Sequence, residues 1–564
     1  MNWQHSADVL TAAKDAGLNT DFVAKGAAMG ADGNYSGNLE RDFLRDAKTR
    51  LGVEFQLCMV PNIVRDSVNI TKDMEICVLL PYEVAHLVYA YNPDKFKELF
   101  PADRIIKFWE RTIEDNPQWF REHPLSETIR SVDRAGLENF LPLHIFGDDG
   151  CLKKTRAMGV ITWFSAVFTK LGAVESRVPF YAVPRHILVQ DYTENELQQI
   201  LVWSFNVWLT GKFPSCDWTG TPWPENSLRA LLARRGGRIA GGHIGVYTST
   251  ICDQMWGKQH YRLEQLWSTD NVCARCGAIN GPGPNNFLNT GEFPPRCCSA
   301  YLESAAGRSS PLSDMPGFGL FSLVGEAMHA GPLGCLLDIV AYRLIDMCFK
   351  DVFGDYSAVT IWQDRLQHQL NTAHHEFSGW ARESGQQHTI RRFGRRGLSM
   401  ETLSSWPEWK GKAHNCLVFT RWLESKSFEV KDSMEHGVLQ WQVMWAWVEW
   451  FSVCLEADPD LLEPEEVARL EKATLLMISG HKRLANECEA AGIWRWKARP
   501  KIHIFYHIMK DVRETRRNPR AWWSFKEEEF MGRLAKIACC THAVTLANRT
   551  LERWCIQFYN EMQD

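Results

Sequence analysis

The sequence lacks three features that would narrow its class at once. Its apolar runs stop short of the roughly 18 residues that a helix needs to span a bilayer. Its start, MNWQHSADVL, lacks the basic and then apolar segments of a secretory signal. Its formal charge of −5 is not the positive excess that attracts nucleic acid broadly. We therefore expect a protein with no membrane partner that is not secreted, although a local basic channel is still allowed.

Cysteine and tryptophan are abundant instead. Because nothing indicates secretion, the 17 cysteines are interpreted as intracellular thiols, some of them metal ligands, and not as a disulfide framework. Many of the 24 tryptophans lie in apolar helical stretches and are expected in the core. The 564 residues suffice for about three domains, or for one large core with insertions.

One short stretch, Pro142–Gly150, organises the rest. An apolar run ends in Gly147-Asp148-Asp149-Gly150, which predicts a buried strand with carboxylates at its carboxyl end. Open α/β sheets place their ligands at that end. The alternative is an ordinary surface turn, since Asp and Gly are common turn residues.

The elements that follow predict a mixed, α+β fold. Apolar and β-branched runs predict further strands, and an apolar stripe predicts a helix, over residues 159–168, 180–189, 194–209 and 242–253. Strand, strand, strand, helix, strand is the order of a ribonuclease-H-like core, a mixed sheet with flanking helices. In such a core the first and fourth strands are neighbours, so we expect Asp148 and Asp253 to face each other.

The chain is divided accordingly. We expect this core to be preceded by an accessory domain and interrupted by a Cys-rich, largely helical insertion. The predicted segments are a flexible lead-in (1–50), an N-terminal accessory domain (51–135), the first part of the core (136–253), the insertion (254–492) and the last part of the core (493–564).

Cysteines in the insertion suggest zinc. Cys273 and Cys276 form a Cys-x2-Cys pair, and Cys297 and Cys298 follow about twenty residues later, which is close to the spacing of tetrahedral zinc sites. His329 is a candidate fourth ligand. The alternative is a set of buried thiols that bind no metal.

Two groups of arginines could hold a phosphate backbone. The alternative is that these arginines are solvent-exposed residues at the end of a helix and bind no ligand. The candidates for DNA binding are Arg234, Arg235, Arg391, Arg392, Arg395 and Arg396.

Several segments, taken in order, resemble the large repeated open reading frames of dinoflagellate-type genomes. Those are similar to mobile-element proteins, namely DDE-type transposases and their domesticated descendants. The segments that carry the resemblance are Gly147–Gly150 with Lys153-Lys154, Trp203-Ser204 with Gly211–Pro214 and Asp217, Asp253 before Cys273-x-x-Cys276, Met328-His329 with Leu333-Gly334, Lys410–Ala413, Pro500-Lys501-x-His503, and Asn518–Arg520 with Glu528-x-Phe-x-Gly532.

The resemblance implies metal-dependent DNA cleavage and strand transfer, by an active or a decayed enzyme. Asp148 would be the first acid, with Asp149 beside it, Asp253 the second and Glu528 the third, holding Mg²⁺ or Mn²⁺. Residues 273–329 would be an insertion after the second acid. The family's [Cys/Asp]-x-x-His element has Glu326 in its first position here. A nuclear location and a DNA partner follow from this function, and a homo-oligomer is allowed.

Alternatives remain open. The chain could be a non-enzymatic, zinc-stabilised nucleic-acid or protein interaction protein derived from a mobile element, in the nucleus or the cytoplasm. It could also be a carboxylate-dependent hydrolase that does not act on DNA. Asp217 competes with Asp253 as the second acid. Four glutamates are candidates for the third acid: Glu326, Glu527, Glu528 and Glu529. His503 and His507 lie either near the site or on a buried helix face, where they would be part of the core.

Overall fold

The computed structural model describes most of the chain. The described residues are 3–18, 57–65, 71–153, 156–189, 191–263, 269–289, 309–319, 323–325, 332–349, 362–402, 405–411, 413–539 and 545–561, with residues 24, 27, 28, 291, 293, 294 and 541. No helix among them is long and apolar enough to cross a membrane. Within the lead-in predicted for residues 1–50, Trp3–Asp15 form helix α1.

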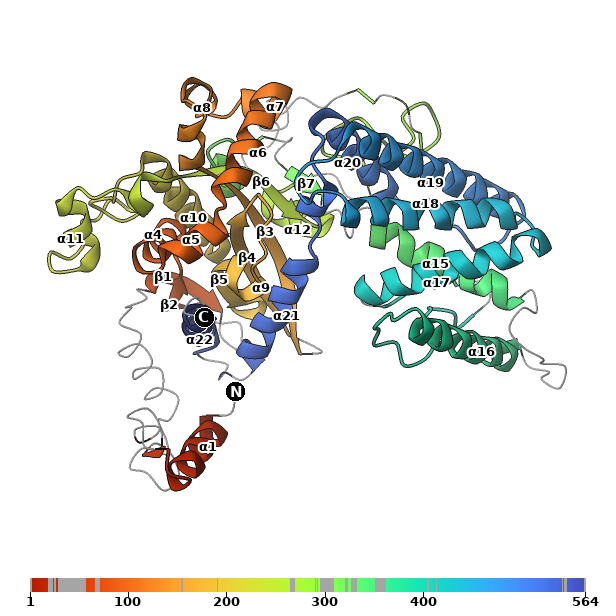
Figure 1. Cartoon of the computed structure of the whole chain (residues 1–564), viewed down its shortest axis with the longest axis horizontal. Coiled ribbons are helices and arrows are strands. Elements are labelled where there is room, and N and C mark those ends of the chain that lie inside the picture. The colour runs from red at the N-terminus through yellow and green to blue at the C-terminus, as the bar shows by residue number, and fades with distance from the viewer. Residues whose placement is uncertain are drawn as a thin grey trace.

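A five-stranded mixed sheet lies at the centre of one half of the molecule (Figure 1). Its spatial order is β5-β4-β3-β6-β7. β3 pairs antiparallel with β4 and parallel with β6, β4 pairs antiparallel with β5, and β6 pairs parallel with β7. The strands are β3 (Phe140–Lys153), β4 (Arg156–Ser165), β5 (Val178–Pro184), β6 (Ile244–Cys252) and β7 (Leu323–Gly325).

The sheet agrees with the strands expected from the sequence, within a few residues at their ends. The first and fourth strands of the expected order, β3 and β6, are indeed side by side. The fifth strand, β7, lies inside the predicted insertion. Three residues are too short a run for a period-two pattern to be recognised in the sequence.

Helices cover both faces of the sheet, so its strands are buried almost throughout. A methyl group on Gly147 would overlap the ring of Trp256 in α12 (Gln254–Tyr261). One on Gly150 would lie 2.7 Å from the Met531 methyl in α21 (Phe525–Cys539). Because successive strand residues point to opposite faces, these two contacts place α12 and α21 on opposite faces of β3.

The N-terminal region packs beside the sheet. A hairpin of β1 (Cys58–Arg65) and β2 (Thr71–Val78) is followed by short helices, and Leu79 donates a backbone hydrogen bond to Phe180 of β5. A helix starts at Pro81, where the missing N–H group costs nothing. The helices of this region are α4 (Pro81–Tyr91), α5 (Pro93–Leu99), α6 (Ala102–Asp115), α7 (Gln118–Arg121) and α8 (Ser126–Ser131).

Two further helices pack beside the sheet and the N-terminal hairpin. The amphipathic pattern over 194–209 forms α10 (Thr193–Thr210), and Trp208 of this helix donates to the carbonyl of His243 at the start of β6. The last helix, α22 (Leu546–Glu561), returns to the hairpin, where the Asn548 side chain accepts from the backbone of Cys77. The end of the chain therefore packs against its N-terminal region.

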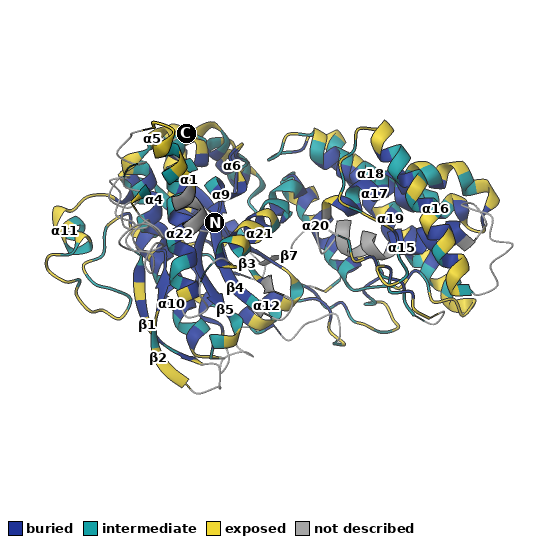
Figure 2. Cartoon of the chain, turned by 90° about the horizontal axis from the view of Figure 1, so that it is seen from below, coloured by how far each residue is buried: buried dark blue, intermediate teal, exposed yellow. Residues whose placement is uncertain are grey.

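A block of long helices forms the other half of the molecule (Figures 1 and 2). Tryptophans fill its core, as the sequence predicts, and Trp447 and Trp450 are fully buried. Its helices are α15 (Pro332–Phe349), α16 (Trp362–Glu383), α17 (Ala413–Val430), α18 (Gly437–Glu456) and α19 (Pro464–Ala490). α20 (Lys501–Thr515) then leads back to the sheet.

Replacement of Gly147 by Ala should destabilise the sheet half, because its methyl group would overlap the Trp256 ring beneath β3. Overpacking of this kind costs about 1–3 kcal/mol of unfolding free energy. Denaturant unfolding followed by tryptophan fluorescence measures the change. Gly532→Ala is the matched control, since that glycine in α21 has open space around it, and it should be neutral or stabilising. Equal stability of the two variants would contradict the contact.

Candidate metal centre and carboxylate edge

A Cys-x2-Cys loop follows α12. Cys273 and Cys276 are both buried, with 5% and 3% of their surface exposed. The backbone N–H of Arg275, between them, donates to the Cys273 sulfur at 3.3 Å, so the loop curls around that sulfur. This curl turns both sulfurs toward the same side.

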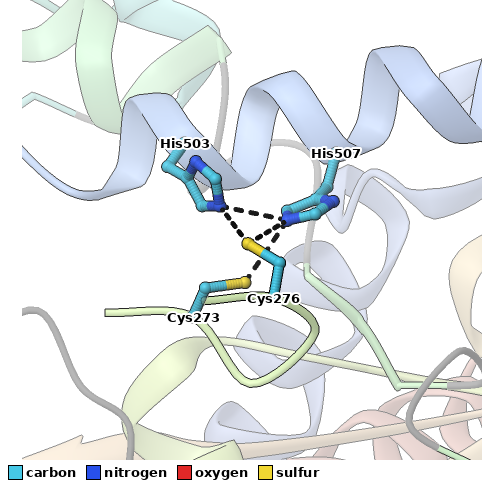
Figure 3. Close-up of side chains that lie close together, drawn as sticks. All are labelled: Cys273, Cys276, His503 and His507. Atoms are coloured by element: carbon cyan, nitrogen blue, oxygen red, sulfur yellow. Dashed lines mark hydrogen bonds between the residues drawn. The ribbon is translucent and has the colours of Figure 1, made fainter. Parts of the chain in front are cut away.

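Helix α20 presents two histidines to these sulfurs. His503 and His507 are four residues apart and therefore lie on one helix face. Their Nε2 atoms are 3.0 Å apart. The Nε2 of His503 lies 3.0 Å from the Cys276 sulfur, and that of His507 lies 3.3 Å from the Cys273 sulfur (Figure 3).

The four atoms form a ligand set compatible with zinc. All four lie within 4.8 Å of one another. Tetrahedral bonds of about 2.3 Å to sulfur and about 2.0 Å to nitrogen place sulfur and nitrogen roughly 3.5 Å apart, close to the distances here. Since the protein supplies all four ligands, the group has the form of a closed, structural metal site.

The environment favours the protonation states that metal binding needs. A hydrogen bond with Cys276 lowers the pKa of Cys273 well below its usual range, against the opposing effect of burial. Burial lowers the pKa of His507. A thiolate and a neutral imidazole are the forms that bind a metal.

An ion pair fastens the same loop to the same helix. Both terminal nitrogens of Arg275 donate to the Asp511 carboxylate, each at 2.7 Å. Asp511 is one turn beyond His507, so α20 holds the loop at three successive turns. Bidentate pairs of this kind are geometrically specific and orient what they join.

The zinc prediction is thus confirmed only in part. Cys273 and Cys276 belong to a group that could hold a metal ion. Cys297, Cys298 and His329 lie outside the described residues. His503 and His507 supply the ligands that the sequence analysis sought nearby. The sequence pattern that could have identified these two ligands is a His-x3-His pair on a helix, which puts both rings on one face. This pair lies more than 220 residues from the cysteines.

The second candidate site is the carboxyl edge of β3 and β6. In their parallel register Gly147 is opposite Cys252, so Asp148 and Asp253 come next on the two strands. Asp148 accepts a hydrogen bond from the Asp149 backbone at 2.7 Å. Asp253 caps α12 by accepting from the Trp256 N–H at 2.6 Å. Asp148 thus lies inside β3, still paired with β4, and Asp253 lies directly after β6, at the point where the β3–β6 pairing ends.

Asp149 belongs to the opposite face of β3. Alternation puts its side chain on the face of α12, where the Arg185 Nε lies 3.1 Å from it. Arg185 also pairs with Glu194 in the first turn of α10. Burial raises the pKa of Asp149, and the charge of Asp253 adds to this, while Arg185 opposes it. Neither Arg185 nor Glu194 was predicted as a site residue. In the sequence, Glu194 stands out only as an acidic residue in the first turn of α10, the helix that follows β5.

The late glutamates differ in their surroundings. Glu527 is buried and pairs with Arg177 at 2.5 Å. Glu529 pairs with Arg533 on the same helix. Glu528 is half-buried and lies three residues before Met531, beside the buried face of α21 that meets β3. Glu326 lies outside the described residues.

These carboxylates do not form a ready-made metal cage. Among the residues that the structure describes, the Cys/His group is the one set of three or more donors within 4.8 Å of each other. Asp148, Asp253 and Glu528 do not meet that distance. Asp217, the competing second acid, instead closes a surface turn by accepting from the N–H groups of Thr219 and Thr221.

The two arginine groups lie at opposite ends of the molecule. Arg234 and Arg235 end α11 (Leu228–Arg235), and both are exposed. The group at 391–396 packs beside α16 through Phe393, which is buried against Phe377. Because α11 and α16 are at opposite ends in Figures 1 and 2, the two groups cannot contact one short ligand together.

No protein-family model matches the chain, and no curated protein matches it.

Purified protein should contain about one zinc ion per chain, because one set of four protein ligands is complete. Cys276→Ser and His503→Ala should each lose most of it, with a lower melting temperature, since structural zinc contributes directly to folding. Elemental analysis and thermal melting measure both. The matched control is Cys216→Ser, a partly exposed cysteine elsewhere. Retention of full zinc by both ligand variants would exclude the site.

Proposed function

We propose that this protein is a DDE-type, metal-dependent DNA phosphodiesterase, transposase-like, on a ribonuclease-H-like core. The support is topological. In a ribonuclease-H-like core, three antiparallel strands are followed along the chain by two strands parallel to the first. The sheet here has those directions and the spatial order β5-β4-β3-β6-β7. The helix between the third and fourth strands, α10, occupies the expected place in the chain order.

One observation carries the proposal. The register of β3 and β6 puts Asp148 and Asp253 one residue beyond a paired position on adjacent strands. The carboxyl ends of parallel strands are where open sheets bind ligands. Asp148 is half-buried and Asp253 is exposed, so both are open to a substrate.

The residues suit hard cations. Carboxylate oxygens are the ligands that Mg²⁺ and Mn²⁺ prefer. Asp148 and Asp253 would hold such ions, and Glu528, three residues before the Met531 that packs on β3, would be the third ligand. Bound cations would neutralise the phosphate and help to form the attacking nucleophile. The chain itself then has to position the phosphodiester and carry the carboxylates.

The Cys/His group has a defined role in this proposal. It joins the loop after the second acid to α20, which directly precedes the helix of the third acid. With zinc bound, it would hold α21 in place on β3. Loss of the metal would then weaken cleavage indirectly, by loosening Glu528.

DNA would be the partner, and a nuclear location would follow. Arg234 and Arg235 at one end, and Arg391, Arg392 and the neighbouring arginines at the other, would contact separate stretches of backbone. Such contacts are sequence-independent and sensitive to salt. A homo-oligomer, in which two copies hold two DNA ends, fits the same proposal.

A second candidate is a non-enzymatic, zinc-stabilised interaction protein derived from a mobile element. The observation that favours it is that several carboxylates already have structural partners. Asp253 caps a helix, Asp149 pairs with Arg185, and Glu527 pairs with Arg177. In that case the sheet would be a scaffold only.

Nicking of supercoiled DNA with Mg²⁺ or Mn²⁺ tests the first candidate. Asp148→Asn and Asp253→Asn should each lower the rate by at least about a hundredfold, because replacing even a residue that only orients a metal ligand costs about 10–100-fold. Asparagine retains the helix cap at position 253, so a loss there reports charge and not folding. Asp217→Asn, in the surface turn, should nick normally. Unchanged nicking by the first two variants, or none by the wild type, would favour the interaction protein.

A further inference from the structure

Arg185 lies at the centre of a polar cluster on the α12 face of the sheet. Its guanidinium pairs with Asp149 and Glu194, and it donates to the Gln259 side chain at 2.8 Å. Its side chain is 24% exposed, so it lies at the rim of the sheet and not in the core. Gly159, opposite Asp149 in the register, makes room, because a methyl group there would lie 3.3 Å from Arg185 Cδ.

A buried histidine faces the same cluster. His260 of α12 is only 4% exposed, and it stacks on Trp256 at 4.1 Å. Its Nδ1 lies 3.0 Å from the Gln198 amide. Its Nε2 is buried without a hydrogen-bond partner, and it lies 4.0 Å from a carboxylate oxygen of Glu194. Such a buried and unsatisfied nitrogen is unusual and calls for an explanation.

We propose that Asp149, Glu194 and His260 form a divalent-cation site, and that the Arg185 guanidinium competes with the metal for its carboxylates. The three donors come from β3, α10 and α12, which are held together by the core. They are not within 4.8 Å of one another here, because the guanidinium lies between the carboxylates.

The donor chemistry selects the ion. Two carboxylates and one imidazole nitrogen suit Mn²⁺ better than Mg²⁺, since Mg²⁺ prefers oxygen ligands alone. With its side-chain amide turned so that the oxygen faces Nδ1, Gln198 would accept from Nδ1–H and leave Nε2 to the metal, as partners of metal-binding histidines commonly do. Asp253 adds nearby negative charge, which also favours a cation.

A phosphate group would complete the arrangement. Arg185, once displaced from the carboxylates, has the planar, bidentate geometry that recognises phosphate. A DNA backbone arriving at this edge could therefore take up the guanidinium and leave the carboxylates to the metal. This role rests on the proposed nuclease, whereas the binding of the cation does not.

The test is Mn²⁺ binding to zinc-loaded, full-length protein, measured from the spin-resonance signal of the free ion. Arg185→Gln should tighten binding at one site by about tenfold, equivalent to about 1.4 kcal/mol. Adding Glu194→Gln or His260→Gln to that variant should remove the gain. Arg229→Gln is the matched control, because Arg229 also pairs with a carboxylate, Glu83, away from the edge.

The outcomes separate this inference from the nuclease. If Arg185→Gln gains no affinity, or if the gain survives both added substitutions in folded protein, the cation site is wrong. Nicking that depends on Asp253 would in that case still support the nuclease. If the Glu194-dependent site is present but no variant nicks DNA, the cation site stands and the nuclease proposal fails. Thermal melting of every variant shows that it is folded.

Discussion

The tie between the Cys-x2-Cys loop and α20 is the constraint on which the rest of the structure depends. It brings residues 273–276 and 503–507 together across more than 220 residues of chain. The loop leaves the sheet shortly after β6, and α20 returns to it just before α21 packs on β3. The tie adds to the direct contacts that hold α21 on the sheet half, namely the buried Glu527–Arg177 pair and the packing of Met531 on Gly150 of β3. The Arg275–Asp511 pair adds a second, metal-independent fastening at the same point.

The sequence predicted the sheet better than the sites. Apolar runs of β-branched residues are local signals, so the strands around Pro142–Gly150 and Gly242–Asp253 could be located, and the chain order suggested that they pair. β7 could not be found, because three residues carry no period. The His-x3-His pair was visible, but its partner cysteines are distant in sequence, and a nearer histidine, His329, was chosen instead. Long-range pairing of this kind is set by packing and not by spacing.

At the carboxylate edge, too, only part of the arrangement could be predicted from the sequence. Two consecutive aspartates inside β3, Asp148 and Asp149, put their carboxylates on opposite faces, because the side-chain period of a strand is two. Asp148 therefore lies on the α21 face, while Asp149 meets Arg185 and Glu194. From the sequence, Asp148 and Asp149 were predicted to belong to one site, because the positions of α21 and α12 on the two faces of β3 cannot be derived from it. Arg185 and His260 become informative only through their surroundings: the first has two carboxylate partners, and the second has a buried nitrogen with none.

The closeness of Cys276 and His503 has an evolutionary consequence. The chain between them, which includes β7 and helices α15 to α19, leaves and returns at nearly the same place, because four side chains join its two ends. A segment whose ends meet can be lengthened, shortened or exchanged at small entropic cost, since closure depends only weakly on loop length. Domain insertions are accepted at such positions for this reason. The Cys/His group therefore marks a point at which helical blocks of different size could be inserted while strands β3 to β6 stay unchanged.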